Sequence, residues 1–150
     1  MYMHHENPLS SSAPCVCTSL RKASRAVTRV YEQAMEGTGL TITQFAILRH
    51  LARLGTMPLS RLAEALVMDR TSLYRALAPL ERQGWVVIAG RGGRMKDATL
   101  STDGRAAMDS AASAWERAQA AMIDRIGSRE WAGLSMALQK IVAINQAVQA

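Results

Sequence analysis

Aromatic residues are scarce in this chain, since Phe, Trp and Tyr together make up 5% of its 150 residues. Apolar residues still reach 49%, and most of them are Ala, Leu, Val, Met and Ile, a mixture rich in strong helix formers. A chain of this length is the size of a single domain. The composition therefore predicts one mainly α-helical domain with enough apolar residues for a core.

Long hydrophobic runs are missing as well. No stretch approaches the roughly 20 apolar residues that a membrane-spanning helix needs. Residues 1–14 lack the basic region and apolar segment of a secretory signal, and we interpret them as a disordered tail. We expect a cytoplasmic chain without membrane contact, in which the two cysteines are kept reduced.

Groups that carry catalysis or bind metals are few. Two of the three histidines, His4 and His5, lie in the tail, and no Ser/His/Asp grouping, phosphate-binding loop or pair of carboxylates stands out. Cys15 and Cys17 could join the tail histidines in a metal site, but C-x-C is not the usual zinc spacing. We therefore expect no enzyme activity, no cofactor and no metal.

Positive charge is in excess and is concentrated in one region. The chain has 18 Lys and Arg residues against 12 Asp and Glu residues, a net charge of +6. From Arg70 to Arg105 there are seven cations and three anions, so +4 of that charge lies in a quarter of the chain. A localised basic surface attracts polyanions, with nucleic acid the first candidate, although a solvated surface can have the same composition.

Hydrophobic spacing predicts four helices, a β-hairpin and two further helices. The first helix is expected over residues 16–36, and the next three begin after caps at Thr43, at Pro58 or Ser60, and at Asp69. The segments WVVIA and DATLS are strand-like and flank a glycine-rich loop.

Two long helices are expected to end the chain, within residues 103–150. They and the first helix have wide, Ala-rich apolar faces that a small domain cannot bury alone. We interpret residues 16–36 and 103–150 as a dimerisation module, so the predicted fold is mainly α with a small β-hairpin.

The segment 59–83 has the pattern of a helix-turn-helix. Its second helix places Leu73, Leu77 and Leu80 on one side and Thr71, Arg75, Ala78 and Arg82 on the other. Pro79 removes one backbone hydrogen bond, so we expect a kink after Ala78 rather than a break.

The hairpin that follows this segment has three glycines and three cations in its loop. A helix-turn-helix followed at once by such a hairpin predicts a winged domain over residues 41–102, with its second helix in the major groove and its loop in the minor groove. A flexible solvated turn is the alternative for the loop. The candidate DNA-binding residues are Arg70, Thr71, Ser72, Tyr74, Arg75, Arg82, Arg91, Arg94 and Lys96.

The middle of the chain resembles the MarR family of winged-helix regulators (multiple-antibiotic-resistance type). MDRTSLYRALAPLERQGWV is similar to the family's recognition helix and first wing strand, and LSTDGRAAM to its L-T-x-x-G segment. The resemblance covers residues 15–150. It implies a homodimer with intertwined terminal helices and two winged domains that read a pseudo-palindromic double-stranded DNA. It also implies a transcriptional repressor that a small molecule or an oxidant releases.

The wing departs from the family pattern, which usually carries Asp-x-Arg. The Asp of that pattern holds the Arg that enters the minor groove. Here Arg94 matches the Arg, but Gly92 occupies the Asp position. We expect Arg94 to be oriented by Asp97 or to be more mobile than in the family.

The resemblance further implies an effector, most often a small aromatic or phenolic anion bound between the first two helices, the long fifth helix and the winged domain. For each candidate residue we favour the alternative role, in which the arginines are surface cations and His50 and Trp115 are solvated or packed helix residues. The candidate ligand-binding residues are Arg21, Ser24, Arg25, Thr28, His50 and Trp115.

Two other modes of action are open. Peroxide-sensing members carry a reactive cysteine where Cys17 lies, and Arg21 with the helix N-terminus would favour a thiolate. The tyrosines that would donate to that thiolate are absent, however, and we favour Cys15 and Cys17 as small side chains at the dimer interface. The remaining alternative is an architectural DNA-binding protein that needs no effector.

Overall fold

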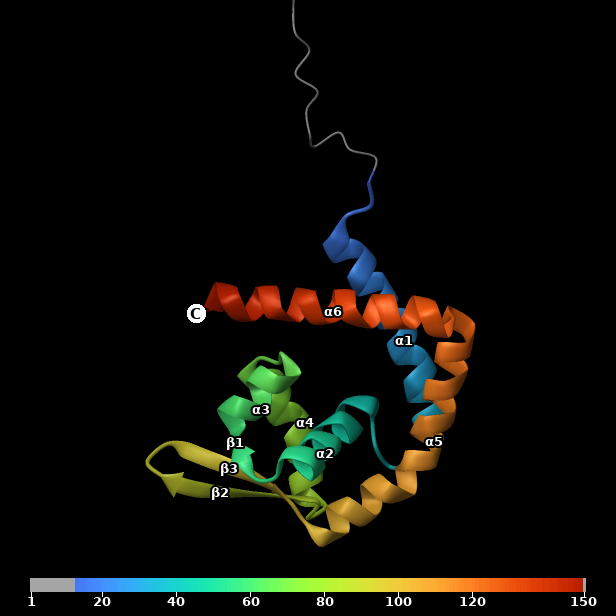
Figure 1. Ribbon diagram of the computed structural model, residues 1–150. Coiled ribbons are helices and arrows are strands. Elements are labelled where there is room, and N and C mark those ends of the chain that lie inside the picture. Colours follow the sequence, from blue (N-terminus) through green and yellow to red (C-terminus); the bar gives the residue numbers. More distant parts are fainter. Residues whose placement is uncertain (1–12, 150) are drawn as a thin grey trace, which may run out of the picture.

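The computed structural model describes residues 13–149, and their elements follow the predicted order (Figure 1). A two-residue strand that the sequence did not indicate precedes the third helix. The elements are α1 (Val16–Met35), α2 (Ile42–Leu54), β1 (Met57–Pro58), α3 (Leu59–Leu66), α4 (Arg70–Arg82), β2 (Val86–Gly92), β3 (Met95–Leu100), α5 (Thr102–Ile126) and α6 (Ser128–Gln149).

The start of α2 differs from the prediction. Its N-cap is Thr41 and not Thr43. The Thr41 hydroxyl accepts a hydrogen bond from Gln44 N at 3.1 Å, and the Gln44 side chain accepts one from Thr41 N at 3.0 Å. This reciprocal capping box needs Gln or Glu three residues after the cap, and Thr43 is followed at that distance by Ala46.

The start of α4 is as predicted, with Asp69 as its N-cap. One Asp69 carboxylate oxygen accepts from Ser72 N and the other from the Ser72 hydroxyl, both at 2.8 Å. The helix continues through Pro79 to Arg82 without a break. Its 13 residues therefore form one continuous helix.

The three strands form an antiparallel sheet in the order β1-β3-β2. Ala98 of β3 pairs with Ile88 of β2 on one side and with Met57 of β1 on the other. The β2–β3 hairpin is longer than the segments WVVIA and DATLS, because pairing continues to Gly92 and Met95 across an irregularity between Gly90 and Gly92. The wing thus reaches well beyond the helical body in Figure 1.

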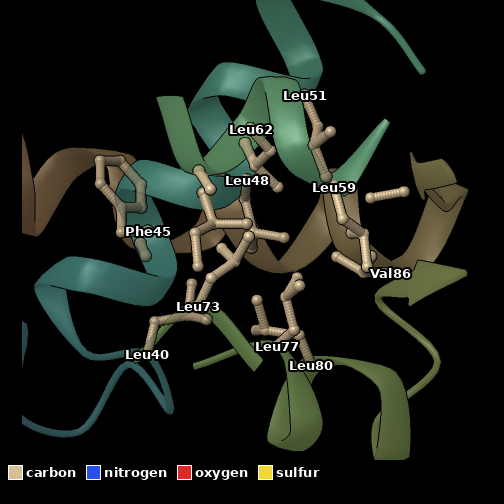
Figure 2. Close-up of a cluster of buried hydrophobic side chains, with 14 of the residues drawn as sticks. Leu40, Phe45, Leu48, Leu51, Leu59, Leu62, Leu73, Leu77, Leu80 and Val86 are labelled. Carbon is tan, nitrogen blue, oxygen red and sulfur yellow. The ribbon is translucent and has the colours of Figure 1, made fainter. Parts of the chain in front are cut away.

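The main core lies between α2, α3, α4 and the sheet (Figure 2). The leucine stripe predicted for α4 is at its centre, since Leu73, Leu77 and Leu80 are each 1% exposed. Figure 2 shows Leu48 of α2 and Leu62 of α3 in the same cluster. Burial on one side of α4 fixes which of its side chains face outward.

The terminal helices bury much less. α5 starts at the end of the wing and runs along α1. α6 then turns back from the end of α5 that lies far from the wing (Figure 1). Most large apolar side chains of α6 remain exposed, namely Leu134, Met136, Ile141, Val142, Ile144 and Val148. No helix within residues 13–149 is both long and apolar enough to cross a membrane.

Candidate nucleic-acid interface

The outward face of α4 carries the predicted DNA-binding residues. Arg70, Thr71, Ser72, Tyr74, Arg75 and Arg82 are all exposed. Because α4 is fixed by its buried leucines and by the Asp69 cap, these polar side chains lie on a rigid helix. Hydroxyl groups and arginines on an exposed helix are suited to phosphates and to base edges.

The wing and the start of α4 meet around a small cavity of about 200 Å³. Arg70 and Tyr74 of α4 line it from one side, and Arg94 and Lys96 line it from the hairpin. The start of α3 completes the wall with Pro58, Leu59 and Ser60. Three cations from two separate elements therefore lie around one polar cavity, an arrangement suited to an anionic group such as a phosphate.

Asp97 orients a different arginine from the one that the sequence suggested. Its carboxylate pairs with Arg91, with Arg91 Nε 3.5 Å from Asp97 Oδ2, whereas Arg94 faces the cavity beside α4. The register of β2 against β3 explains why Asp97 pairs with Arg91 and not with Arg94. Asp97 is paired with Ala89, two residues before Arg91 on the facing strand, and Arg94 lies in the turn.

A larger apolar cavity of about 460 Å³ lies between α1, α5 and α6. Among its few polar groups, the Tyr31 hydroxyl donates to the Gln119 side chain, and partial burial raises the pKa of Tyr31. The lining residues are Leu20, Ala23, Ser24, Val27, Tyr31, Gln119, Met122, Ile123, Ile126, Trp131, Leu134 and Leu138. The signal in the sequence is the apolar spacing of these helices, which predicts a dimer contact and does not predict a cavity.

The six candidate ligand residues do not line this cavity together. Ser24 lines it, and Arg21, Ser24 and Arg25 line an adjoining open groove on α1, while Thr28 is exposed. His50 on α2 has its Nδ1 3.3 Å from the carbonyl of Ala46.

Trp115 belongs to the junction between α2 and α5. Its ring centroid is 5.8 Å from that of Phe45, and the Arg49 guanidinium carbon lies 4.1 Å from the Trp115 ring. A cation over an aromatic ring is attracted by the electron density of its face. Trp115 therefore joins α5 to the winged part of the chain.

Both cysteines are free and exposed at the start of α1. Cys15 is the N-cap of that helix and Cys17 lies in its first turn. The backbone and hydroxyl of Thr18, and the backbone of Cys17, favour the charged form and so lower the pKa of the Cys15 thiol. Of the two redox candidates, Cys15 thus has groups beside it that favour a thiolate, and a reactive cysteine at Cys17 stays a prediction. Within residues 13–149 no cluster of three potential metal ligands occurs, and His4 and His5 lie outside the described residues.

Comparison with known proteins gives a family and a fold. The profile described as MarR family matches residues 40–87, and no curated protein sequence matches significantly. The M. tuberculosis transcriptional regulator MosR in complex with DNA is 29% identical with a TM-score of 0.80, and the match covers 91% of this chain and all of that one.

A second structure of MosR is 30% identical with a TM-score of 0.71 over 84% of this chain and 96% of that one. A probable transcriptional regulator from Pseudomonas aeruginosa, 23% identical, has the same fold with a TM-score of 0.74 over 84% of this chain and 96% of that one.

Proposed function

The chain belongs to the MarR family of transcriptional regulators, and from this premise we propose that it is a homodimeric repressor of transcription. It binds a pseudo-palindromic operator in double-stranded DNA, with α4 in the major groove and the wing at the adjacent minor groove. It acts in the cytoplasm, without catalysis of its own.

The observation that carries this proposal is the common orientation of α4 and the wing. Arg70 and Tyr74 of the helix and Arg94 and Lys96 of the hairpin line one cavity, so the two elements offer their cations on the same side. A DNA duplex offers phosphates on both sides of each groove. A surface with this arrangement can contact a groove and its flanking backbone at the same time.

The exposed apolar face of the terminal helices supports a dimer. On α6, Leu134, Ile141, Ile144 and Val148 recur at helical spacing and are 42%, 39%, 63% and 80% exposed in the single chain. Contiguous apolar surface on a protein usually marks an interaction site. A second copy would cover this face, and the two-fold axis would place two α4 helices against two half-sites of one operator.

The cavity between α1, α5 and α6 supports a small aromatic effector. Its volume is within the range of small-molecule sites, which are mostly apolar with a few polar groups. Leu20 and Ser24 line both this cavity and the open groove with Arg21 and Arg25. A phenolic acid could therefore place its ring among the apolar side chains and its carboxylate toward the two arginines.

A thiol-based signal is the second candidate. The lowered pKa and exposure of Cys15 favour a thiolate, which is the form that peroxides oxidise. Oxidation at this position would change the exposed first turn of α1. A Cys15→Ser, Cys17→Ser double variant that stays on DNA under peroxide, while wild type leaves it, would establish this signal.

The test of the main proposal is binding of the purified protein to the intergenic DNA upstream of its own gene. A salt titration against scrambled DNA of equal length separates specific from electrostatic binding. We expect two chains per site, a steep salt dependence and a clear preference for the native sequence. Binding should weaken with phenolic acids if the effector proposal is correct. Equal, weak binding to both DNAs would instead support an architectural protein.

A further inference from the structure

The wing contains an ion pair between Arg91 and Asp97, and this pair gives Arg91 and Arg94 different surroundings. We infer that Arg91, held by Asp97, and not Arg94, is the arginine that this wing presents to the minor groove, with Asp97 as its positioning residue. This inference rests on the proposed function, because it concerns how the same surface selects its DNA.

The geometry of the ion pair leaves the terminal nitrogens of Arg91 free to contact DNA. Asp97 Oδ2 engages Arg91 at Nε, the nitrogen nearest the aliphatic stem. The two terminal nitrogens of the guanidinium remain available, and the Arg91 side chain is 56% exposed. Five donors in a rigid plane allow an arginine to be held at one edge while it binds at the other.

Asp97 is confined in a way that favours this one partner. Its side chain is only 22% exposed. Its Oδ1 atom is buried and has no hydrogen-bond partner among residues 13–149. Pro58 faces it across the β1–β3 pair and has no N–H to donate. Because Arg91 remains 56% exposed, solvent screens the pair, and its effect is to orient the Arg91 side chain rather than to add stability.

The backbone around Arg91 is narrow enough to approach a minor groove. Gly90 and Gly92 flank it and Gly93 follows, and a Cβ at any of the three would meet nothing within 4 Å. Arg91 is also the extra residue at the irregularity between Gly90 and Gly92, where bulges commonly redirect a side chain. Arginine is favoured in narrow A·T-rich minor grooves because their electrostatic potential is strongly negative.

Arg94 has a different place. It lines the cavity with Arg70 and Lys96 beside the recognition helix. Clustered cations next to a helix that enters the major groove suit the phosphate backbone, which positions a protein without reading sequence. The two arginines should therefore differ in what their loss does to sequence preference.

Two DNA duplexes with the same core site and either A·T-rich or G·C-rich flanks provide the readout, which is the ratio of the two affinities. Arg91→Ala and Asp97→Asn should each lower the wild-type ratio, by about tenfold for Arg91→Ala if one base step is read. Arg94→Ala should weaken binding to both duplexes alike. Arg91→Lys should also lower the ratio, since an ammonium group lacks the planar set of donors of a guanidinium group.

The role of Asp97 as a positioning residue is tested in a double-variant cycle. Asp97→Asn should change the ratio in the wild type and leave it unchanged in the Arg91→Ala background. If Asp97 only repelled phosphates, its loss would strengthen binding to every duplex equally. That result would overturn the inference, as would a ratio that survives Arg91→Ala. Thermal unfolding of each variant shows whether it is folded.

The wild-type measurement separates this inference from the proposed function. A protein that does not prefer its native site over scrambled DNA contradicts the proposed function itself. A protein that prefers its native site but has no flank preference contradicts only the role given to Arg91.

Discussion

Gly104 of α5 lies directly against the backbone carbonyl of Trp85, so closely that a Cβ on Gly104 would overlap the Trp85 oxygen. The same Cβ would lie 2.9 Å from Leu100 Cδ1. Ser101 strengthens this junction, because its backbone N–H donates to the Trp85 carbonyl at 3.0 Å and its hydroxyl accepts from Gly104 N at 3.0 Å. The end of α4, the end of the wing and the start of α5 are therefore fixed to one another.

Gly104→Ala should destabilise the protein by about 1–3 kcal/mol, because the methyl group has no space and the backbone carbonyl cannot move aside cheaply. The measurement is denaturant unfolding at a fixed protein concentration. Gly133→Ala is the matched control, since Gly133 lies within α6 and a Cβ there would meet nothing within 4 Å. Equal stability of wild type and Gly104→Ala would mean that α5 can shift away from the wing.

Much of the winged part could be predicted because its signals are local. The leucine stripe of α4, the Asp69 cap and the glycine loop each depend on residues close together in sequence. The sequence predicts the cap of α2 wrongly because Thr41 and Thr43 are both capping residues, and only the Gln44 side chain decides between them.

The pairing of Asp97 with Arg91 and the cavity between α1, α5 and α6 could not be predicted from the sequence. The pairing depends on the register of β2 against β3, and an irregularity between Gly90 and Gly92 shifts that register. The cavity depends on how α1 approaches α5 and α6, from which the whole winged domain separates it in sequence. Spacing within one helix predicts an apolar face but not which element covers it.

Val67 ends α3 in the left-handed conformation, with φ 51° and ψ 46°, although its side chain is β-branched. Such a conformation costs an ordinary residue about 1–2 kcal/mol. Glycine avoids this cost, but its greater backbone entropy in the unfolded chain offsets part of the gain in stability. Val67→Gly should therefore raise the free energy of unfolding, by roughly 0.5–1 kcal/mol.

Chemical denaturation measures this gain, and Val87→Gly is its control. Val87 is similarly exposed but lies within the extended strand β2, where glycine should lower stability. If both substitutions destabilise the protein, the turn between α3 and α4 is not strained at Val67.

Asp69 should make the stability of the protein depend on pH in the acid range. Hydrogen bonds from Ser72 N–H and its hydroxyl lower the pKa of the Asp69 carboxyl below its usual 3.8. Because the folded pKa is below the unfolded one, the stabilisation is complete above pH 3.8 and is lost as pH falls through the folded pKa.

Asp69→Asn tests this dependence, because Asn caps helices about as well as Asp but does not titrate. We expect the difference in unfolding temperature between wild type and Asp69→Asn to change below about pH 4 in the direction of a less stable wild type. Asp69→Ala should lower the unfolding temperature already at pH 7, since it removes the cap. A wild type and Asp69→Asn that respond identically to acid would contradict the assigned pKa shift.

Arg75 is expected to determine base preference, because it lies on the exposed side of α4, opposite the buried Leu73 and Leu77. Arg75→Ala should weaken binding to the native site by about 1–3 kcal/mol and reduce discrimination at one base position in each half-site. The measurement is affinity for a set of duplexes with single base changes. Arg117→Ala, which removes an exposed cation from α5, controls for the change in net charge. If Arg75→Ala instead weakens binding to every duplex equally and lowers the salt dependence by about one ion, Arg75 contacts a phosphate and another residue of α4 reads the base.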